Sequence, residues 1–208
     1  MTTLPTRTAR RGWLRMLSAA GLVAFATLAG CTRDAPPSFN ATDITGANYG
    51  DGFRLVDSNG QVRELADFRG KAVLLYFGFI QCPDVCPTAL FRAVEVKRLL
   101  GPLGERFQTV YITVDPERDT PDIVREYLAA FDPGFVGLHP TMDELPAVTK
   151  HFRVFYRKVP TGDSYTMDHT ATSFVFDPQG RLRLAVSHQM EADAIAADMK
   201  LLLSSNQP

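Results

Sequence analysis

Short apolar runs alternate along the chain with longer stretches in which apolar residues recur at a helical period. Ala72–Phe79 (AVLLYFGF) and Phe107–Val114 (FQTVYITV) have the length and composition of strands buried on both faces of a sheet. Between them, the apolar residues of Pro87–Leu100 follow a roughly helical period, and Gly101 marks the end of this predicted helix. Strands that alternate with helices in this way indicate an α/β fold.

Further elements follow from the same patterns and from turn signals. They are a hairpin of Phe53–Val56 and Gln61–Leu65 around Asn59-Gly60, helices from Pro121 to Leu128, Glu144 to Phe152 and Glu191 to Leu203, a strand at Val154–Val159, and a hairpin of Thr172–Phe176 with Leu182–Val186. Together they predict a thioredoxin-like fold, in which helices flank a central mixed β-sheet and an N-terminal hairpin precedes it. Open α/β sheets place their sites at the carboxyl ends of strands, which draws attention to the residues after Phe79.

The composition of the first 50 residues differs from that of the rest of the chain and predicts export. Residues 1–30 contain four arginines, no acidic residue and an apolar run, Met16–Gly30, shorter than the roughly 20 residues that a membrane span needs. The run ends in Leu-Ala-Gly-Cys31, the pattern of a bacterial lipobox. We therefore predict a lipoprotein signal peptide over residues 1–30, a lipid on Cys31 and a flexible tether over residues 31–50, with an uncleaved N-terminal anchor as the alternative. Either reading places the domain, residues 51–205, outside the cytoplasm, on the periplasmic side and attached to a membrane.

The charge balance argues against a nucleic-acid partner. The chain has a formal net charge of −1, but four of its 22 basic residues and none of its 23 acidic residues lie within residues 1–30. The remainder is therefore mildly acidic and offers no basic surface for phosphates. With 208 residues, the chain has room for one well-packed domain.

Two cysteines directly follow the first buried strand, in Cys82-Pro-Asp-Val-Cys86-Pro. Pro83 and Pro87 stiffen this loop, so Cys86 is expected near the helix N-terminus, where free N–H groups favour a thiolate. Such a pair in an oxidising compartment indicates redox chemistry, a metal site or a local disulfide. Two thiolates suit Cu(I) or Zn and are poor ligands for Mg or Ca. A disulfide across so short a loop would constrain the unfolded chain little.

A third ligand has to come from elsewhere, and His169 has the most suitable position among the four histidines. It lies in a polar segment, Tyr165–Thr170, which we expect to be a loop before the strand Thr172–Phe176. If this strand neighbours Ala72–Phe79, the loop can fold over the cysteines. Asp168 is either a residue that orients the imidazole or a turn residue. The remaining histidines are expected to be solvated or capping residues: His139, His151 and His188.

The turn-rich segment Asp115–Pro121 carries three acidic residues, Asp115, Glu117 and Asp119. It allows two interpretations, a rim beside the cysteines or a turn that leads into a helix capped by Thr120.

Three blocks of sequence resemble the SCO/SenC family. They are Gly70–Ala89 (GKAVLLYFGFIQCPDVCPTA), Ile112–Pro121 (ITVDPERDTP) and Asp168–Gly180 (DHTATSFVFDPQG), and the match covers most of residues 50–205. The resemblance implies a thioredoxin fold, attachment to a membrane and a role in assembling the binuclear copper (CuA) centre of cytochrome c oxidase. It also implies that both cysteines and the histidine bind one copper ion, as Cu(I) or Cu(II), and these map onto Cys82, Cys86 and His169.

Two functions remain open at this point. The first is a metallochaperone, not an enzyme, that binds copper and delivers it to cytochrome c oxidase subunit II or another copper-receiving protein. The second is a thiol-disulfide reductase that keeps the cysteines of such a protein reduced. Both functions use Cys82 and Cys86, but only copper binding requires His169.

Overall fold

The computed structural model describes residues 38–204, in which a six-stranded mixed sheet forms the centre. Its strands, in spatial order, are β1 (Thr42–Asp43), β10 (Leu182–Val186), β9 (Ser173–Phe176), β4 (Ala72–Gly78), β5 (Phe107–Thr113) and β6 (Val136–Leu138). β4, β5 and β6 run parallel, whereas β9 lies antiparallel to β4, and β10 and β1 continue the antiparallel side. The neighbourhood of β4 and β9, on which the placement of His169 depended, is confirmed.

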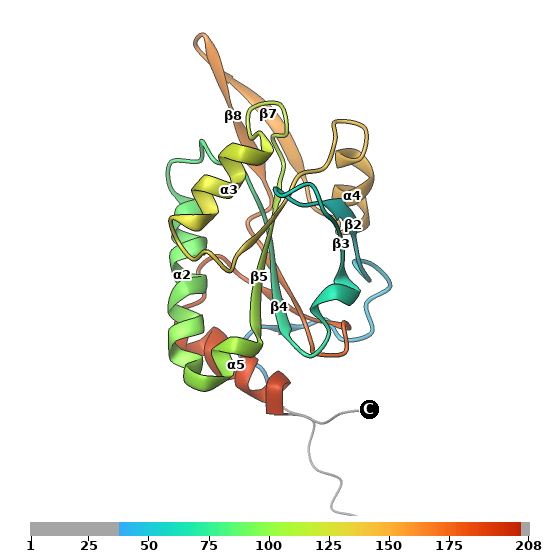
Figure 1. The fold of residues 1–208 in the computed structure, drawn as a ribbon, viewed down its shortest axis with the longest axis vertical. Helices are drawn as coiled ribbons and strands as arrows, with labels where there is room; N and C mark the ends of the chain where they lie inside the picture. Colours follow the sequence, from blue (N-terminus) through green and yellow to red (C-terminus); the bar gives the residue numbers. More distant parts are fainter. Residues whose placement is uncertain (1–37, 205–208) are drawn as a thin grey trace, which may run out of the picture. The chain divides into compact units, whose positions relative to one another are not determined.

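Alternating side chains of β4 contribute to two separate cores, as expected for a strand that is buried on both faces. Leu74 packs with α2 (Val85–Leu100) and α5 (Ala192–Ser204). Val73 and Leu75 pack with the opposite layer. That layer consists of the β2–β3 hairpin (Arg54–Val56 and Val62–Glu64), the short 3-10 helix η1 (Leu65–Phe68) and α4 (Leu145–His151). Figure 1 shows α2 and α3 (Pro121–Ala129) on one side of the sheet and α4 with the hairpin on the other.

The second hairpin corrects one expectation. The segment that we expected to be a polar loop is a strand, β8 (Ser164–His169), which pairs over its whole length with β7 (Tyr156–Thr161). Of its six side chains only that of Met167 is buried, so its sequence contains no run or alternation of apolar residues that would predict a strand. Backbone pairing, and not burial, therefore makes β8 a strand. The hairpin extends beyond the end of the sheet at which β4 terminates (Figure 1).

The expected tether is also shorter than predicted. Residues 38–50 belong to the folded domain, because β1 pairs with β10 and the backbone N–H groups of Asn40 and Ala41 donate to the buried carboxylate of Asp198. The pattern missed this segment because its order depends on partners about 150 residues away. The predicted signal peptide and Cys31 lie outside the described residues. No helix within residues 38–204 is long and apolar enough to cross a membrane.

Candidate metal centre

The cysteine loop follows the carboxyl end of β4, where the fold was expected to place a site. α2 begins at Val85, two residues earlier than predicted, because Pro87 is tolerated within the first helical turn. Cys86 lies in that first turn and is fully buried, and Cys82 is 8% exposed. Both are free thiols in this structure.

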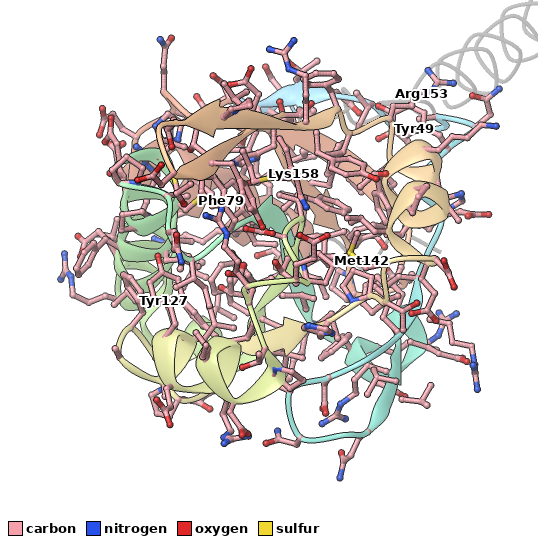
Figure 2. All side chains as sticks on the ribbon, turned by 90° about the horizontal axis from the view of Figure 1, so that it is seen from above. Tyr49, Phe79, Tyr127, Met142, Arg153 and Lys158 are labelled. Carbon is pink, nitrogen blue, oxygen red and sulfur yellow. The ribbon has the colours of Figure 1, made fainter. Side chains whose placement is uncertain are left out.

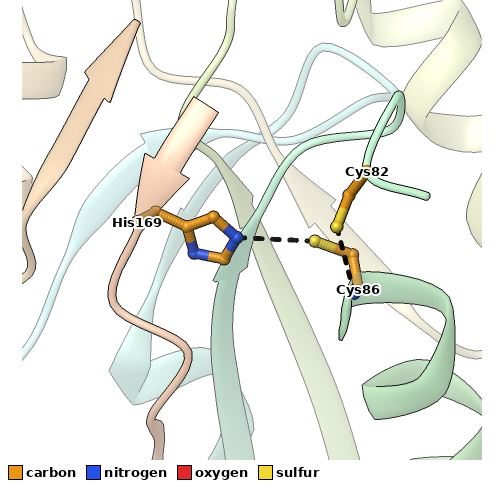
Figure 3. Close-up of side chains that lie close together, drawn as sticks. All are labelled: Cys82, Cys86 and His169. Carbon is orange, nitrogen blue, oxygen red and sulfur yellow. Dashed lines mark hydrogen bonds between the residues drawn. The ribbon is translucent and has the colours of Figure 1, made fainter. Parts of the chain in front are cut away.

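His169, the last residue of β8, reaches the cysteines from the other side of the loop (Figure 3). Its Nε2 lies 3.6 Å from Sγ of Cys86, and the ligand atoms of Cys82, Cys86 and His169 all lie within 4.8 Å of one another. The imidazole Nδ1 is 3.0 Å from the carbonyl oxygen of Thr170. A proton on Nδ1 that is donated to this carbonyl leaves the Nε2 lone pair directed at the sulfur atoms.

The electrostatics of the two thiols reverse an expectation from the sequence. The N–H of Cys86 donates to Sγ of Cys82 at 3.4 Å, so the helix N-terminus stabilises negative charge on Cys82 and not on Cys86. A hydrogen bond from Cys86 lowers the pKa of Cys82 to about 4, against the opposing effect of burial and with further help from His169. The same thiol pair and burial raise the pKa of Cys86. The N–H of Cys86 and the lowered pKa of Cys82 therefore favour Cys82 over Cys86 as the thiolate.

The absence of a side chain at Gly78 leaves room for Cys86 and for two tyrosine rings at the end of β4. A Cβ atom on Gly78 would lie 2.9 Å from the rings of both Tyr76 and Tyr111 and 3.1 Å from Sγ of Cys86. The hydroxyl of Tyr76 donates to that sulfur at 3.5 Å. The sequence does not single out Tyr76, because a tyrosine within an apolar run resembles an ordinary core residue.

Asp168 does not orient the imidazole. Its carboxylate pairs with Arg157 of the neighbouring strand at 2.6 Å, and about half of its side chain is exposed. Side chains alternate along a strand, so Asp168 and His169 project from opposite faces of β8. Asp168 lies directly across from Arg157 of β7. The backbone carbonyl of Thr170 makes the contact with the imidazole that was one of the two interpretations of Asp168.

The acidic segment lies beside the cysteine loop and also caps a helix, so both interpretations hold in part. Thr120 accepts a hydrogen bond from the N–H of Ile123 and begins α3, as predicted. Asp119 is buried and accepts hydrogen bonds from the N–H of Ile80 and the hydroxyl of Thr113. Asp119 therefore fixes the backbone two residues before Cys82.

The remaining histidines take no part in the cluster. Among the described residues, the only group of three or more His, Cys, Asp and Glu side chains with suitable spacing for a metal ion is Cys82, Cys86 and His169. His151 instead forms an exposed pair with Asp51 at 2.8 Å. Figure 2 views the molecule from the end at which the cluster lies, with Phe79 and Lys158 near the middle.

The geometry of the cluster fits a soft metal ion. Zn²⁺ binds sulfur at about 2.3 Å and nitrogen at about 2.0 Å, which places ligand atoms about 3.5 to 4 Å apart around such an ion. The separation of 3.6 Å between Cys86 Sγ and His169 Nε2 agrees with this spacing. Two sulfur donors and one imidazole form a set that copper or zinc accepts and that magnesium and calcium disfavour.

Fold and site together define a class, a thioredoxin-like domain with two cysteines and one histidine clustered at the end of its central strand. The sequence model of the SCO1/SenC family matches residues 41–204. The chain belongs to the SCO1/SenC family.

Named relatives agree with this assignment. The chain is 38% identical over 135 residues to a SCO2-like protein of Rickettsia felis, and 38% identical over 152 residues to the mitochondrial SCO2 homolog of Bos taurus. These matches cover 64% and 71% of this chain but only 66% and 57% of the two relatives. Among solved structures, copper-bound ScoI of Bradyrhizobium japonicum is 41% identical, with a TM-score of 0.67 over 73% of this chain and 97% of that one. Apo Sco1 of Thermus thermophilus is 38% identical, with a TM-score of 0.69 over 81% and 99%. The thioredoxin-like fold is thereby confirmed.

Proposed function

We propose that this protein is a copper chaperone that holds one copper ion through Cys82, Cys86 and His169. The single observation that carries the proposal is the convergence of these three side chains, from two distant segments, with their ligand atoms within 4.8 Å. The copper bound to the related Bradyrhizobium protein supports copper over zinc. We propose delivery to the CuA centre of cytochrome c oxidase, through subunit II or another copper-receiving protein.

The donor set suits a cargo that must be released again. Two thiolates and one imidazole hold Cu(I) in a near-trigonal arrangement, and Cu(II) accepts the same set with an added oxygen ligand. His169 is half-buried and Cys82 is 8% exposed, whereas Cys86 is fully buried. A partner would therefore take over copper by replacing His169 and Cys82 before Cys86.

The reductase remains the second candidate, and the low pKa of Cys82 favours it. In this reaction the Cys82 thiolate attacks a disulfide of the partner and releases one partner thiol. Cys86 then displaces the second partner thiol, which leaves a Cys82–Cys86 disulfide and has moved two electrons to the partner. His169 takes no part in these bond changes.

We also propose that the domain works on the periplasmic side of a membrane, anchored by a lipid on Cys31. The apolar run before Cys31 and the residues Leu-Ala-Gly-Cys support this proposal. Mass spectrometry of the membrane fraction should find an acylated N-terminus at Cys31, and an unmodified Met1 would contradict it.

Anaerobic copper titration of the reduced protein tests the chaperone function. We expect one copper ion per chain, loss of tight binding in Cys82→Ser and Cys86→Ser, and at least about a tenfold weaker affinity for Cu(II) in His169→Ala. His151→Ala is the matched control, because its imidazole is exposed and outside the cluster. Oxidase maturation in cells then separates the two candidates. Failure with His169→Ala supports copper delivery, and normal maturation favours the reductase.

A further inference from the structure

Arg118 contacts both the cysteine loop and the hairpin that carries His169. Nη1 of Arg118 donates to the side-chain oxygen of Gln81, the residue before Cys82, at 2.9 Å. The same nitrogen donates to the backbone carbonyl of Tyr165, four residues before His169 on β8, at 2.8 Å. Nε of Arg118 pairs with Asp115 at 2.5 Å. A single guanidinium therefore joins the cysteine loop, the acidic segment and the hairpin.

This arginine is held more firmly than an exposed ion pair. Its side chain is 16% exposed and the side chain of Asp115 is 1% exposed, so solvent screens their pairing little. The guanidinium carbon lies 3.6 Å from the ring centroid of Tyr165, and the hydroxyl of this tyrosine donates to Asp115 at 2.8 Å. Arg118, Asp115 and Tyr165 thus contact one another in all three pairs, and Tyr165 also contacts Glu117 and Lys158. The planar guanidinium supplies the stacking and the divergent donors that this set needs.

The hairpin depends on such contacts for its position. β7 and β8 form a two-stranded sheet of their own and, within residues 38–204, share no ladder with the central sheet. An isolated two-stranded hairpin has little stability without packing against other elements. His169 is held at one end by β9, which begins four residues later at Ser173, and by ring contacts with Tyr76 and Phe79. The rest of the hairpin is positioned by side-chain contacts, and those of Arg118 reach both the hairpin and the cysteine loop. Lys158 of β7 pairs with Glu117 of the acidic segment in addition, but both side chains are nearly half exposed.

We propose that Arg118 is a positioning residue that holds the His169-bearing hairpin against the cysteine loop and so sets the geometry of the three-ligand copper site. The expected effect on copper affinity rests on the proposed copper binding, whereas the placement of the hairpin by Arg118 does not. Arg118 acts through His169 and does not touch the ligand atoms themselves.

Hydrogen exchange of the metal-free protein tests the structural part. Arg118→Lys keeps a positive charge beside Asp115 but loses the flat, divergent donors. We expect amides of β7 and β8 to exchange at least about tenfold faster, with β4 and β5 unchanged. Arg157→Lys is the matched control, because Arg157 lies on the same hairpin in an exposed pair with Asp168. Gln81→Ala, which removes only one contact of Arg118, gives a second and milder variant. Unchanged hairpin exchange in both variants overturns the proposal.

A double-mutant cycle tests the consequence for copper. In the wild-type background, Arg118→Lys should weaken Cu(II) affinity about tenfold, the scale seen when a residue that orients a ligand is lost. In the His169→Ala background, the same substitution should change the affinity less than about twofold, because the ligand that Arg118 positions is absent. Equal losses in both backgrounds would show a general structural role and overturn the proposal. If the wild-type protein bound no copper, the proposed function would fail, and hydrogen exchange would still decide the role of Arg118.

Discussion

Two oxygen atoms near the cluster, neither of them a proposed metal ligand, form hydrogen bonds with the side chains of His169 and Cys86. The carbonyl of Thr170 fixes the imidazole of His169, and the hydroxyl of Tyr76 donates to Sγ of Cys86. A hydrogen bond to a thiolate withdraws electron density from the sulfur, and such bonds tune the reduction potential of copper–thiolate sites. At the scale of residues, the structure therefore predicts effects on copper chemistry from side chains that are not ligands.

Tyr76→Phe should change the electronic properties of the copper site while keeping its ligands. Without the hydrogen bond, Cys86 becomes a stronger donor, so the sulfur-to-Cu(II) charge-transfer band should move to longer wavelength and the reduction potential should fall. The lost hydrogen bond should lower the free energy of unfolding by about 1 kcal/mol. Visible absorption spectra and potentiometry measure the first effect. Tyr111→Phe is the control, because the buried hydroxyl of Tyr111 has no hydrogen-bond partner among residues 38–204, and an equal spectral shift there would contradict the explanation.

Asp119 should make stability depend on pH. Burial raises its pKa from 3.8 to about 6, despite hydrogen bonds from Thr113 and Ile80. The folded state then binds a proton at a higher pH than the unfolded state, so stability increases as pH falls from about 7 towards 4 and is lost again as pH rises through 6. Relative to Asp119→Asn, the metal-free wild type should gain about 1 kcal/mol between pH 7 and pH 5. Urea unfolding at both pH values measures this difference, and a constant difference between the two proteins would refute the assignment.

At the scale of elements, the end of β4 determines where the cysteine loop can lie. β4 is buried along its whole length, and Gly78 is its last residue. The absence of a side chain there lets the rings of Tyr76 and Tyr111 approach Sγ of Cys86. The central strand and the N-terminus of α2 thus meet more closely than a larger residue would permit.

Gly78→Ala should therefore damage both packing and the cluster. The added methyl group would lie 2.9 Å from two buried rings, and such overpacking costs about 1–3 kcal/mol of unfolding free energy. Displacement of Cys86 should also weaken copper binding. Gly52→Ala is the control, because the nearest atom to its added methyl group is 4.0 Å away. Denaturant unfolding and copper titration measure the two effects, and wild-type values in Gly78→Ala would contradict the argument.

At the scale of the whole molecule, the segment that leads into the domain closes one edge of the sheet. β1 covers β10, and the carboxylate of Asp198, which is 1% exposed, accepts hydrogen bonds from the backbone of Asn40 and Ala41. Without these donors, a buried charge on α5 would lack partners. The folded unit therefore includes residues that composition alone assigns to a tether.

A protein that begins at Asn48 should be less stable than one that begins at Ser38. Loss of β1 leaves the buried Asp198 without the N–H donors of Asn40 and Ala41, which should cost about 1–3 kcal/mol. Calorimetry of the two proteins measures the difference in Tm. Asp198→Ala should destabilise the longer protein and affect the shorter one less, because the carboxylate has already lost these partners there. Equal Tm values for the two lengths would show that the segment adds nothing.

The sequence by itself indicated most of the elements and the candidate ligands. Apolar runs and helical periods located β4, β5, α2 and α3, because burial within a segment leaves a local pattern. The spacing of Cys82 and Cys86 after a buried strand, together with the family resemblance, indicated both cysteines and His169. The location of these elements is confirmed because it depends on neighbouring residues, and the role of the three side chains as ligands stays a prediction.

The tertiary structure alone decided which groups meet. It made β8 a strand through pairing with β7, favoured the thiolate on Cys82 through the N–H of Cys86, and placed the carbonyl of Thr170, not Asp168, next to the imidazole. It also brought Arg118 between the cysteine loop and the hairpin, 37 and 47 residues away along the chain. Such contacts leave no local period or spacing, because each partner's identity is set by how distant segments pack. The sequence therefore predicted the three candidate ligands, and only the folded chain showed which contacts hold these side chains together.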